Sequence, residues 1–195
     1  MSLQTADPPN AARAAVHSML GRLIEGDAHQ VSALRTASRS SLSVSTPHRI
    51  ALLRLDRIHA GMSLRSAAEN KGWRFLVHDG DRVVAAASSS LSGKGKHRFA
   101  HVSEGPFVAG SERAIRKAES LEAVRKGRFE PVLLSVPAVH LIALWLQNLD
   151  RDADLVMPIA PAPKGFRASR ALAADDFVAL LVDLAARTPR ESNAP

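Results

Sequence analysis

The 195-residue chain contains no cysteine and no tyrosine, and phenylalanine and tryptophan together make up only 4% of it. The absence of cysteine excludes disulfides, zinc–thiolate sites, iron–sulfur clusters and thiol nucleophiles. The scarcity of aromatic side chains argues against a surface that stacks bases or sugars. Leucine, valine, isoleucine and alanine must therefore build most of the core.

Long apolar stretches are missing as well. No apolar run approaches the roughly 20 residues that a membrane-spanning helix needs. The opening MSLQTADPPN lacks the basic segment and long apolar stretch of a secretory signal. With 46% hydrophobic and 23% charged residues, the chain is expected to be a globular, cytoplasmic protein that does not bind a membrane.

The net charge of +7 is unevenly distributed. Residues 91–130 hold nine lysines and arginines against five acidic residues, whereas residues 131–195 hold six against seven. A basic region of this kind attracts nucleic acid, an acidic protein or a phosphorylated ligand. It is also typical of an ordinary solvated surface.

The first part of the chain has a helical pattern. We predict helices over 10–25, near 31–34, from Thr46-Pro47 to Gly61, and after Ser63, with the serine-rich stretch 37–46 as a linker. The expected organisation is therefore a helical N-terminal appendage with its linker (1–45), an α+β domain (46–188) and a disordered tail (189–195).

From Trp73 onward the apolar spacing indicates strands. The Asp-Gly turn within residues 73–89 predicts a hairpin, and 98–103 is expected to add a strand beyond the Gly93–Lys96 turn. A helix capped by Ser111 and ending at Gly127 should follow. Further strands are expected in the apolar runs 132–136, 138–146 and 155–160, before a last helix over 173–187.

This order of elements predicts an α+β fold, with a mostly antiparallel sheet of about five to six strands and flanking helices. The order resembles the profilin-like or roadblock arrangement over roughly residues 47–187. The resemblance is one of element order only, and it implies no function.

The stretch LSGKGKHRFAHVSEGPFVAG (91–110) holds the best candidates for a ligand site. It does not fit a phosphate-binding P-loop, because strand-like residues follow Lys96 where a helix should begin. An anion site is still expected where the strand leads into the helix, since a helix start offers free backbone amides beside cationic side chains. The candidate residues are Lys94, Lys96, His97, Arg98, His101, Ser103 and Ser111.

Metal chemistry has one candidate in the same stretch. If 97–103 is an extended strand, His97 and His101 share a face and would ligate zinc with a third residue from elsewhere. Two hydrogen-bonded, partly exposed histidines on an edge strand are the simpler interpretation, so we predict no metal and no cofactor. His140, inside an apolar run, is expected to be a buried neutral histidine.

Two other patterns predict no binding site. The acidic stretch Asp150–Asp154 lacks the glycine and glutamate of a calcium loop, so a solvated hairpin turn is expected there. Residues 59–73 look like the first part of a helix-turn-helix, but a strand follows where the recognition helix should lie.

Three functional hypotheses remain. The first is a non-catalytic protein-interaction module that binds a protein partner or itself as a homo-oligomer through its N-terminal helices. The second is an anion-binding or nucleic-acid-binding protein that uses the basic region 94–128. The third is a hydrolase with a site near His101, Ser103 and Glu104, although no G-x-S-x-G sequence is present.

Overall fold

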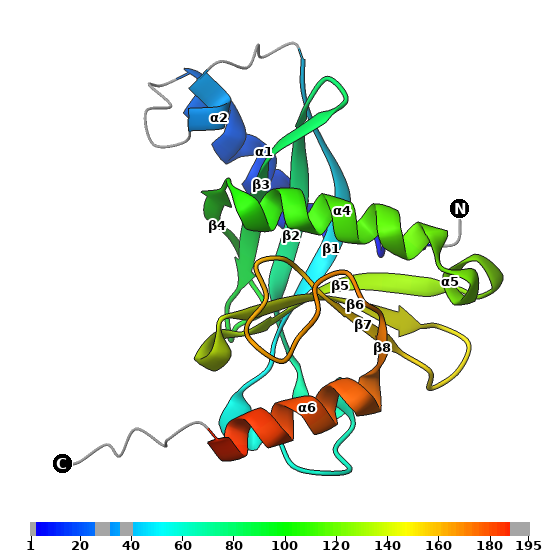
Figure 1. Ribbon diagram of the computed structural model, residues 1–195. Coiled ribbons are helices and arrows are strands. Elements are labelled where there is room, and N and C mark those ends of the chain that lie inside the picture. The colour runs from blue at the N-terminus through cyan, green and yellow to red at the C-terminus, as the bar shows by residue number, and fades with distance from the viewer. Residues whose placement is uncertain (1–2, 26–31, 36–40, 188–195) are drawn as a thin grey trace.

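The computed structural model describes residues 3–25, 32–35 and 41–187, and it is organised around one eight-stranded sheet (Figure 1). The strands are β1 (Leu42–Leu52), β2 (Glu69–Asp79), β3 (Arg82–Leu91), β4 (His97–Ser103), β5 (Phe129–Val136), β6 (Leu141–Asn148), β7 (Leu155–Pro158) and β8 (Leu172–Ala173). The helices are α1 (Asn10–Glu25), α2 (Ser32–Arg35), α3 (Leu64–Ala67), α4 (Pro106–Ser120), α5 (Glu122–Lys126) and α6 (Ala174–Arg187), with 3₁₀ turns at Leu55–Arg57 and Pro137–Val139.

The sheet consists of two antiparallel meanders that meet side by side. Its strand order is β4-β3-β2-β1-β5-β6-β7-β8, and only the central β1–β5 pair is parallel. A parallel pair needs a crossover connection, and here α4 and α5 lie in the connection that leads to β5. The sheet is strongly twisted, so β1–β3 run up the molecule in Figure 1 whereas β5–β7 run across it.

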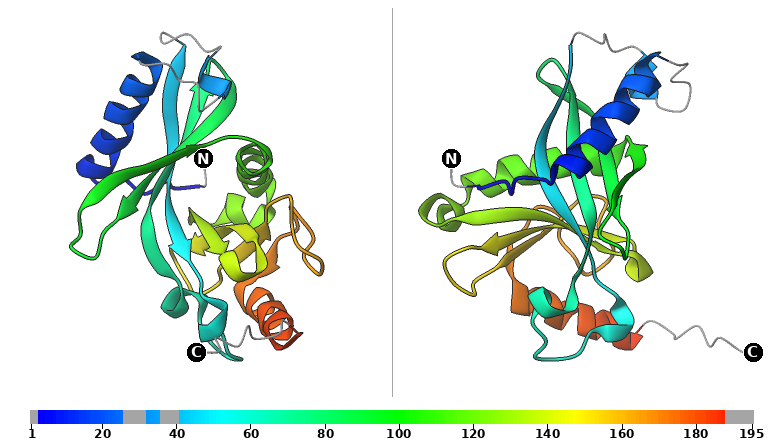
Figure 2. Two further views of the ribbon diagram at one scale, coloured as in Figure 1. Left: turned by 90° about the vertical axis from the view of Figure 1, so that its left-hand side faces the viewer. Right: turned by 180° about the vertical axis from the view of Figure 1, so that it is seen from behind.

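Helices cover both faces of the sheet (Figure 2). On what we call the α4 face, α4 packs across both meanders; the buried residues of this cluster include Leu76, Ala86, Val108, Ala114, Ile115, Ala118, Leu133, Leu144 and Met157. On the opposite, α1 face, Ala12, Val16 and Leu20 pack on Trp73 and Phe75. Helix α6 covers β5–β7 through Phe177, Val178 and Leu181.

A glycine allows α4 to approach the segment after β7. A Cβ at Gly110 would lie 2.6 Å from a side-chain carbon of Ile159 and 2.7 Å from the carbonyl oxygen of Ala160. These separations are too short for any residue but glycine, so Gly110 fixes how closely α4 lies on this segment.

The α+β class and several elements are confirmed. The helix over 10–25, the hairpin around Asp79-Gly80, the strand at 98–103 and the C-terminal helix are all present, and a short helix covers 32–35. The sheet is mixed and has eight strands, more than the five to six that were predicted. The predicted tail, 189–195, lies outside the described residues.

The predicted helix from Thr46 to Gly61 is wrong. Residues 42–52 form β1, which pairs with β2 on one side and β5 on the other. Most residues of β1 are only half-buried, so no sustained apolar alternation marks the strand, and Thr46-Pro47 resembles a helix start although it forms a β-bulge. The predicted domain boundary at 45/46 therefore falls inside a strand, as does the predicted linker over 42–46, whereas its residues 37–40 lie outside the described part of the chain; α1 packs on the same sheet.

Three smaller predictions also need correction. Helix α4 begins at Pro106 after Gly105, so Ser111 is not its cap; Ser111 is buried in the second turn and donates to the carbonyl oxygen of Phe107. His140 is exposed in a left-handed turn, because the apolar run is interrupted by the 3₁₀ turn before β6. In the acidic turn, Asp154 is buried and hydrogen-bonded, whereas Asp150 and Asp152 are exposed as expected.

No helix within the described part of the chain is both long and apolar enough to cross a membrane.

Candidate functional site: a polar row across the sheet

The clearest candidate site begins with a buried arginine on β2. Arg74 is only 6% exposed, and its Nε is buried without a hydrogen-bond partner. Its side chain forms no ion pair or hydrogen bond with any residue that the structure describes. Burial lowers the pKa of the Arg74 guanidinium to about 10, so the group remains charged at neutral pH. An unpaired buried cation is costly and requires an explanation.

Arg74 belongs to a row of four polar side chains that crosses the first meander. His48 on β1 pairs with Arg74, Arg74 pairs with Ser88 on β3, and Ser88 pairs with His101 on β4. Paired residues on one face of a sheet have Cβ atoms about 5 Å apart. We call His48, Arg74, Ser88 and His101 the polar row. Because Leu76 and Ala86 lie on the α4 face two residues from Arg74 and Ser88, the polar row lies on this face too.

A β-bulge places His48 on the α4 face. Ser45 pairs with Leu76 and His48 pairs with Arg74, so Thr46 and Pro47 together oppose a single residue of β2. Thr46 has a φ of 49°, an uncommon and strained conformation for a β-branched residue. Without the extra residue, His48 would point to the opposite face.

A second bulge does the same for His101. Ser89 pairs with Phe99 and Ser88 pairs with His101, so Ala100 is the extra residue. His97 and Phe99 therefore lie on the α1 face, and His101 lies on the α4 face. The expectation that His97 and His101 share a face is wrong, because it assumed an uninterrupted strand. Two bulges thus direct both ends of the polar row toward Arg74, and bulges are over-represented next to active sites.

The protonation of His48 follows from its contacts. Its Nδ1 lies 2.8 Å from the carbonyl oxygen of Thr46, which can only accept a hydrogen bond, so Nδ1 carries the proton. Burial, the largest effect, lowers the pKa of His48 to about 4; the hydrogen bond to Thr46 acts against this shift and the charge of Arg74 contributes to it. The neutral ring therefore presents Nε2 as a buried acceptor without a partner.

The polar row opens toward the sheet edge. His48 and Ser88 are each 1% exposed, and the Ser88 hydroxyl is also buried without a partner. His101 is exposed, although partial burial and then the charge of Arg74 lower its pKa. Arg98, also exposed, lies on the same face one row further along β4, where it pairs with Ser90. The polar row therefore runs from the buried His48 to the exposed His101, which lies beside the exposed cation of Arg98.

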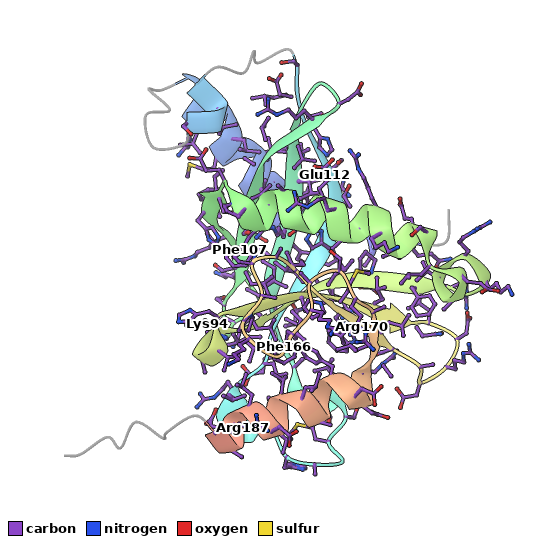
Figure 3. All side chains as sticks on the ribbon, viewed as in Figure 1. Lys94, Phe107, Glu112, Phe166, Arg170 and Arg187 are labelled. Atoms are coloured by element: carbon purple, nitrogen blue, oxygen red, sulfur yellow. The ribbon has the colours of Figure 1, made fainter. Side chains whose placement is uncertain are left out.

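The residues predicted from the sequence are only partly brought together. Arg98, His101 and Ser103 share the α4 face; His101 is paired with Ser88, and Arg98 is paired with Ser90 one row further along. Lys94 and Lys96 lie on the exposed β3–β4 turn, and Figure 3 shows Lys94 at that end of the hairpin. His97 is on the other face, and Ser111 is buried in α4.

The hydrolase and zinc hypotheses gain no geometric support. The Ser103 hydroxyl donates to the carbonyl oxygen of Ala86, and the Glu104 carboxylate accepts hydrogen bonds from Ser32. No hydrogen bond links either residue to His101 within the described residues. Over the same part of the chain, no three histidine, aspartate or glutamate side chains form a group that could hold a metal ion.

Several charged groups outside the polar row have partners. On the basic helices, Arg116 pairs with Glu112 and Lys126 pairs with Glu122. Arg128 pairs with Asp150. A hollow of ≈ 600 Å³ lies between α5 and the β6–β7 turn and is lined in part by these paired residues. This surface lacks the unpartnered buried groups that distinguish the polar row.

The sequence reasoning missed His48, Arg74 and Ser88. Arg74 carried a usable signal: in the strand Trp73–Val77, alternation places Trp73, Phe75 and Val77 on one face and Arg74 on the other, in a segment too apolar to be exposed. His48 carried none, because its segment was assigned to a helix.

Comparisons with protein-family models, with curated proteins and with solved structures found no match, so the resemblance to the profilin-like or roadblock arrangement remains one of element order.

Proposed function

We propose that the protein binds an anionic small molecule or an anionic group of a larger ligand through Arg74 and the polar row. The observation that carries this proposal is Arg74: the residue is only 6% exposed, its Nε is buried without a partner, and its side chain forms no ion pair or hydrogen bond with the described residues. A folded protein bears the cost of such a group most readily where a ligand supplies the missing charge.

The surroundings of Arg74 agree with this proposal. Ser88 and His48 offer buried polar atoms without partners beside it, and two bulges are needed to build the row. Arg98 and His101 add positive and polar character at the open end, where an anion would first arrive. This is a narrower form of the anion-binding hypothesis, moved from the β3–β4 turn to the face of the sheet.

Ligand-linked stabilisation tests the proposal. At constant ionic strength, phosphate, sulfate and acetate should be compared with chloride for their effect on the thermal unfolding midpoint. At least one of these anions should raise the midpoint of the full chain, because binding to the folded state alone stabilises it.

The Arg74→Met variant should lose this effect. The same substitution at Arg82, an exposed arginine at the start of β3, should retain it. Equal responses in the two variants, or no response to any anion in the unmodified protein, would contradict the proposal.

The protein-interaction hypothesis remains a prediction with less support. The apolar residues Ala12, Val16 and Leu20 of α1 are buried against the sheet, so this helix already has a partner within its own chain. Light scattering on the full chain tests self-association, and a monomer at all concentrations would count against the homo-oligomeric form of this hypothesis.

A further inference from the structure

We propose that the polar row selects a phosphoryl group that still carries a proton, as in inorganic phosphate or a phosphate monoester, over anions that have only acceptor oxygens. This inference rests on the proposed function, and it adds the chemical class of the ligand.

The argument starts from which atoms can donate and which can accept. The Arg74 guanidinium has only donors, and it requires an anionic oxygen. The Ser88 hydroxyl both donates and accepts. The Nε2 atom of His48 can only accept, because the proton of the ring is on Nδ1, which faces the carbonyl oxygen of Thr46 at 2.8 Å. A ligand that satisfies the row must therefore combine an anionic oxygen with an O–H or N–H donor.

The position of the His48 acceptor is firmly set. The ring is 1% exposed, its other nitrogen is hydrogen-bonded, and the bulge at Thr46 and Pro47 fixes the direction of the side chain. His48 and Arg74 are direct cross-strand neighbours, so one small group can reach both.

A singly protonated phosphoryl group meets both requirements. Its charged oxygens accept from Arg74 and Ser88, and its P–OH donates to His48. The second pKa of a phosphate monoester is about 6, so near this pH a large fraction carries the proton. Sulfate, ionised carboxylates and phosphate diesters carry no such proton, so they would leave the buried His48 acceptor unpaired.

The open end of the row suggests how a larger ligand lies. His101 and Arg98 are exposed on β4, whereas His48 is closed off. The phosphoryl group would enter past His101, and the rest of a monoester would extend toward the β4 edge.

Calorimetric titration of the full chain at pH 6, at constant ionic strength, tests this selectivity without any mutation. The ligands are inorganic phosphate, methyl phosphate, dimethyl phosphate and sulfate. Phosphate and methyl phosphate should bind at least about tenfold more tightly than sulfate and dimethyl phosphate, the ratio expected for one buried acceptor left unpaired. Tight binding of phosphate with weak binding of methyl phosphate would instead identify free phosphate as the ligand, within the same chemistry.

The variant His48→Phe provides the second arm. It removes the acceptor and keeps a ring of similar size, so the phosphate-to-sulfate affinity ratio should fall to about one. Circular dichroism should first show that the variant is folded, and His17→Phe, at an exposed histidine of α1 outside the polar row, is the matched control that should keep the ratio.

The two proposals fail in different ways. Equal affinities for phosphate and sulfate in the unmodified protein, both lost in Arg74→Met, would overturn the selectivity and leave anion binding intact. Anion binding that does not depend on Arg74 would overturn both.

Discussion

Asp154 and Arg74 are both more than nine-tenths buried, and they lie in different halves of the sheet. Asp154 precedes β7 and accepts hydrogen bonds from Trp145 Nε1 at 2.9 Å, from the Asn148 backbone at 2.8 Å and from the Arg65 guanidinium at 2.5 and 2.9 Å. Arg74 has no such partner among the described residues. A buried charge whose hydrogen bonds are all satisfied stabilises the fold, whereas a buried charge without a partner is best explained by a ligand.

The arginines of the two halves show the same contrast. The pKa of Arg65 is raised, and the largest cause is its hydrogen bonding to Asp154. Burial alone lowers the pKa of Arg74. The contrast predicts that removing the charge of Asp154 will destabilise the protein, whereas removing the charge of Arg74 will stabilise it.

The largest effect is expected at Asp154. Asp154→Ala leaves Trp145 Nε1 and the Asn148 amide without an acceptor and removes the partner of Arg65, so we expect a loss of about 3 to 4 kcal/mol in the free energy of unfolding. Urea denaturation measures this loss. Asp152→Ala is the control, because the Asp152 side chain is 86% exposed and lies 3.9 Å from Arg65; it should cost less than about 0.5 kcal/mol. Similar losses in both variants would show that Asp154 is not a structural centre.

The next effect concerns pH and His48. The pKa of His48 is about 4 in the folded protein and 6.5 for an unperturbed histidine, so the unfolded chain binds more protons between these values. Stability should therefore fall as the pH is lowered from about 6.5 to about 4, by up to roughly 3 kcal/mol. Unfolding curves across this range measure the slope.

The variant His48→Gln should flatten that slope. His101→Gln is the matched control: its pKa is also lowered, but the side chain is exposed, so the slope should change little. An unchanged slope in His48→Gln would show that His48 is accessible to protons in the folded protein.

The elements that sequence reasoning found are those with local signals. The Asp79-Gly80 hairpin and the α1 and α6 helices follow from turn chemistry and 3.6-residue spacing. β1 was missed because most of its residues are only half-buried, so no sustained alternation marks it as a strand, and its partners, β2 and β5, lie far along the chain. The polar row depends on this strand and on two bulges that shift the register by one residue. A single inserted residue reverses the face of every later side chain, so the site could not be assembled from spacing alone.

The smallest effect, and the one opposite in sign, is expected at Arg74. Arg74→Met removes an unpaired buried charge and keeps a side chain of similar length, so in the absence of anions the protein should become more stable by about 1 to 2 kcal/mol. Arg49→Met is the matched control in the neighbouring strand, because Arg49 donates to Glu130 at 2.6 Å and to Gln147 at 2.5 Å, and its loss should destabilise the protein by about 1 to 3 kcal/mol. Urea denaturation in chloride buffer gives both values.

Phosphate should then narrow the difference in stability between Arg74→Met and the unmodified protein, because it stabilises only the chain that keeps its arginine. If Arg74→Met is destabilised like Arg49→Met, Arg74 supports the fold through packing of its stem, and the comparison with Asp154 fails.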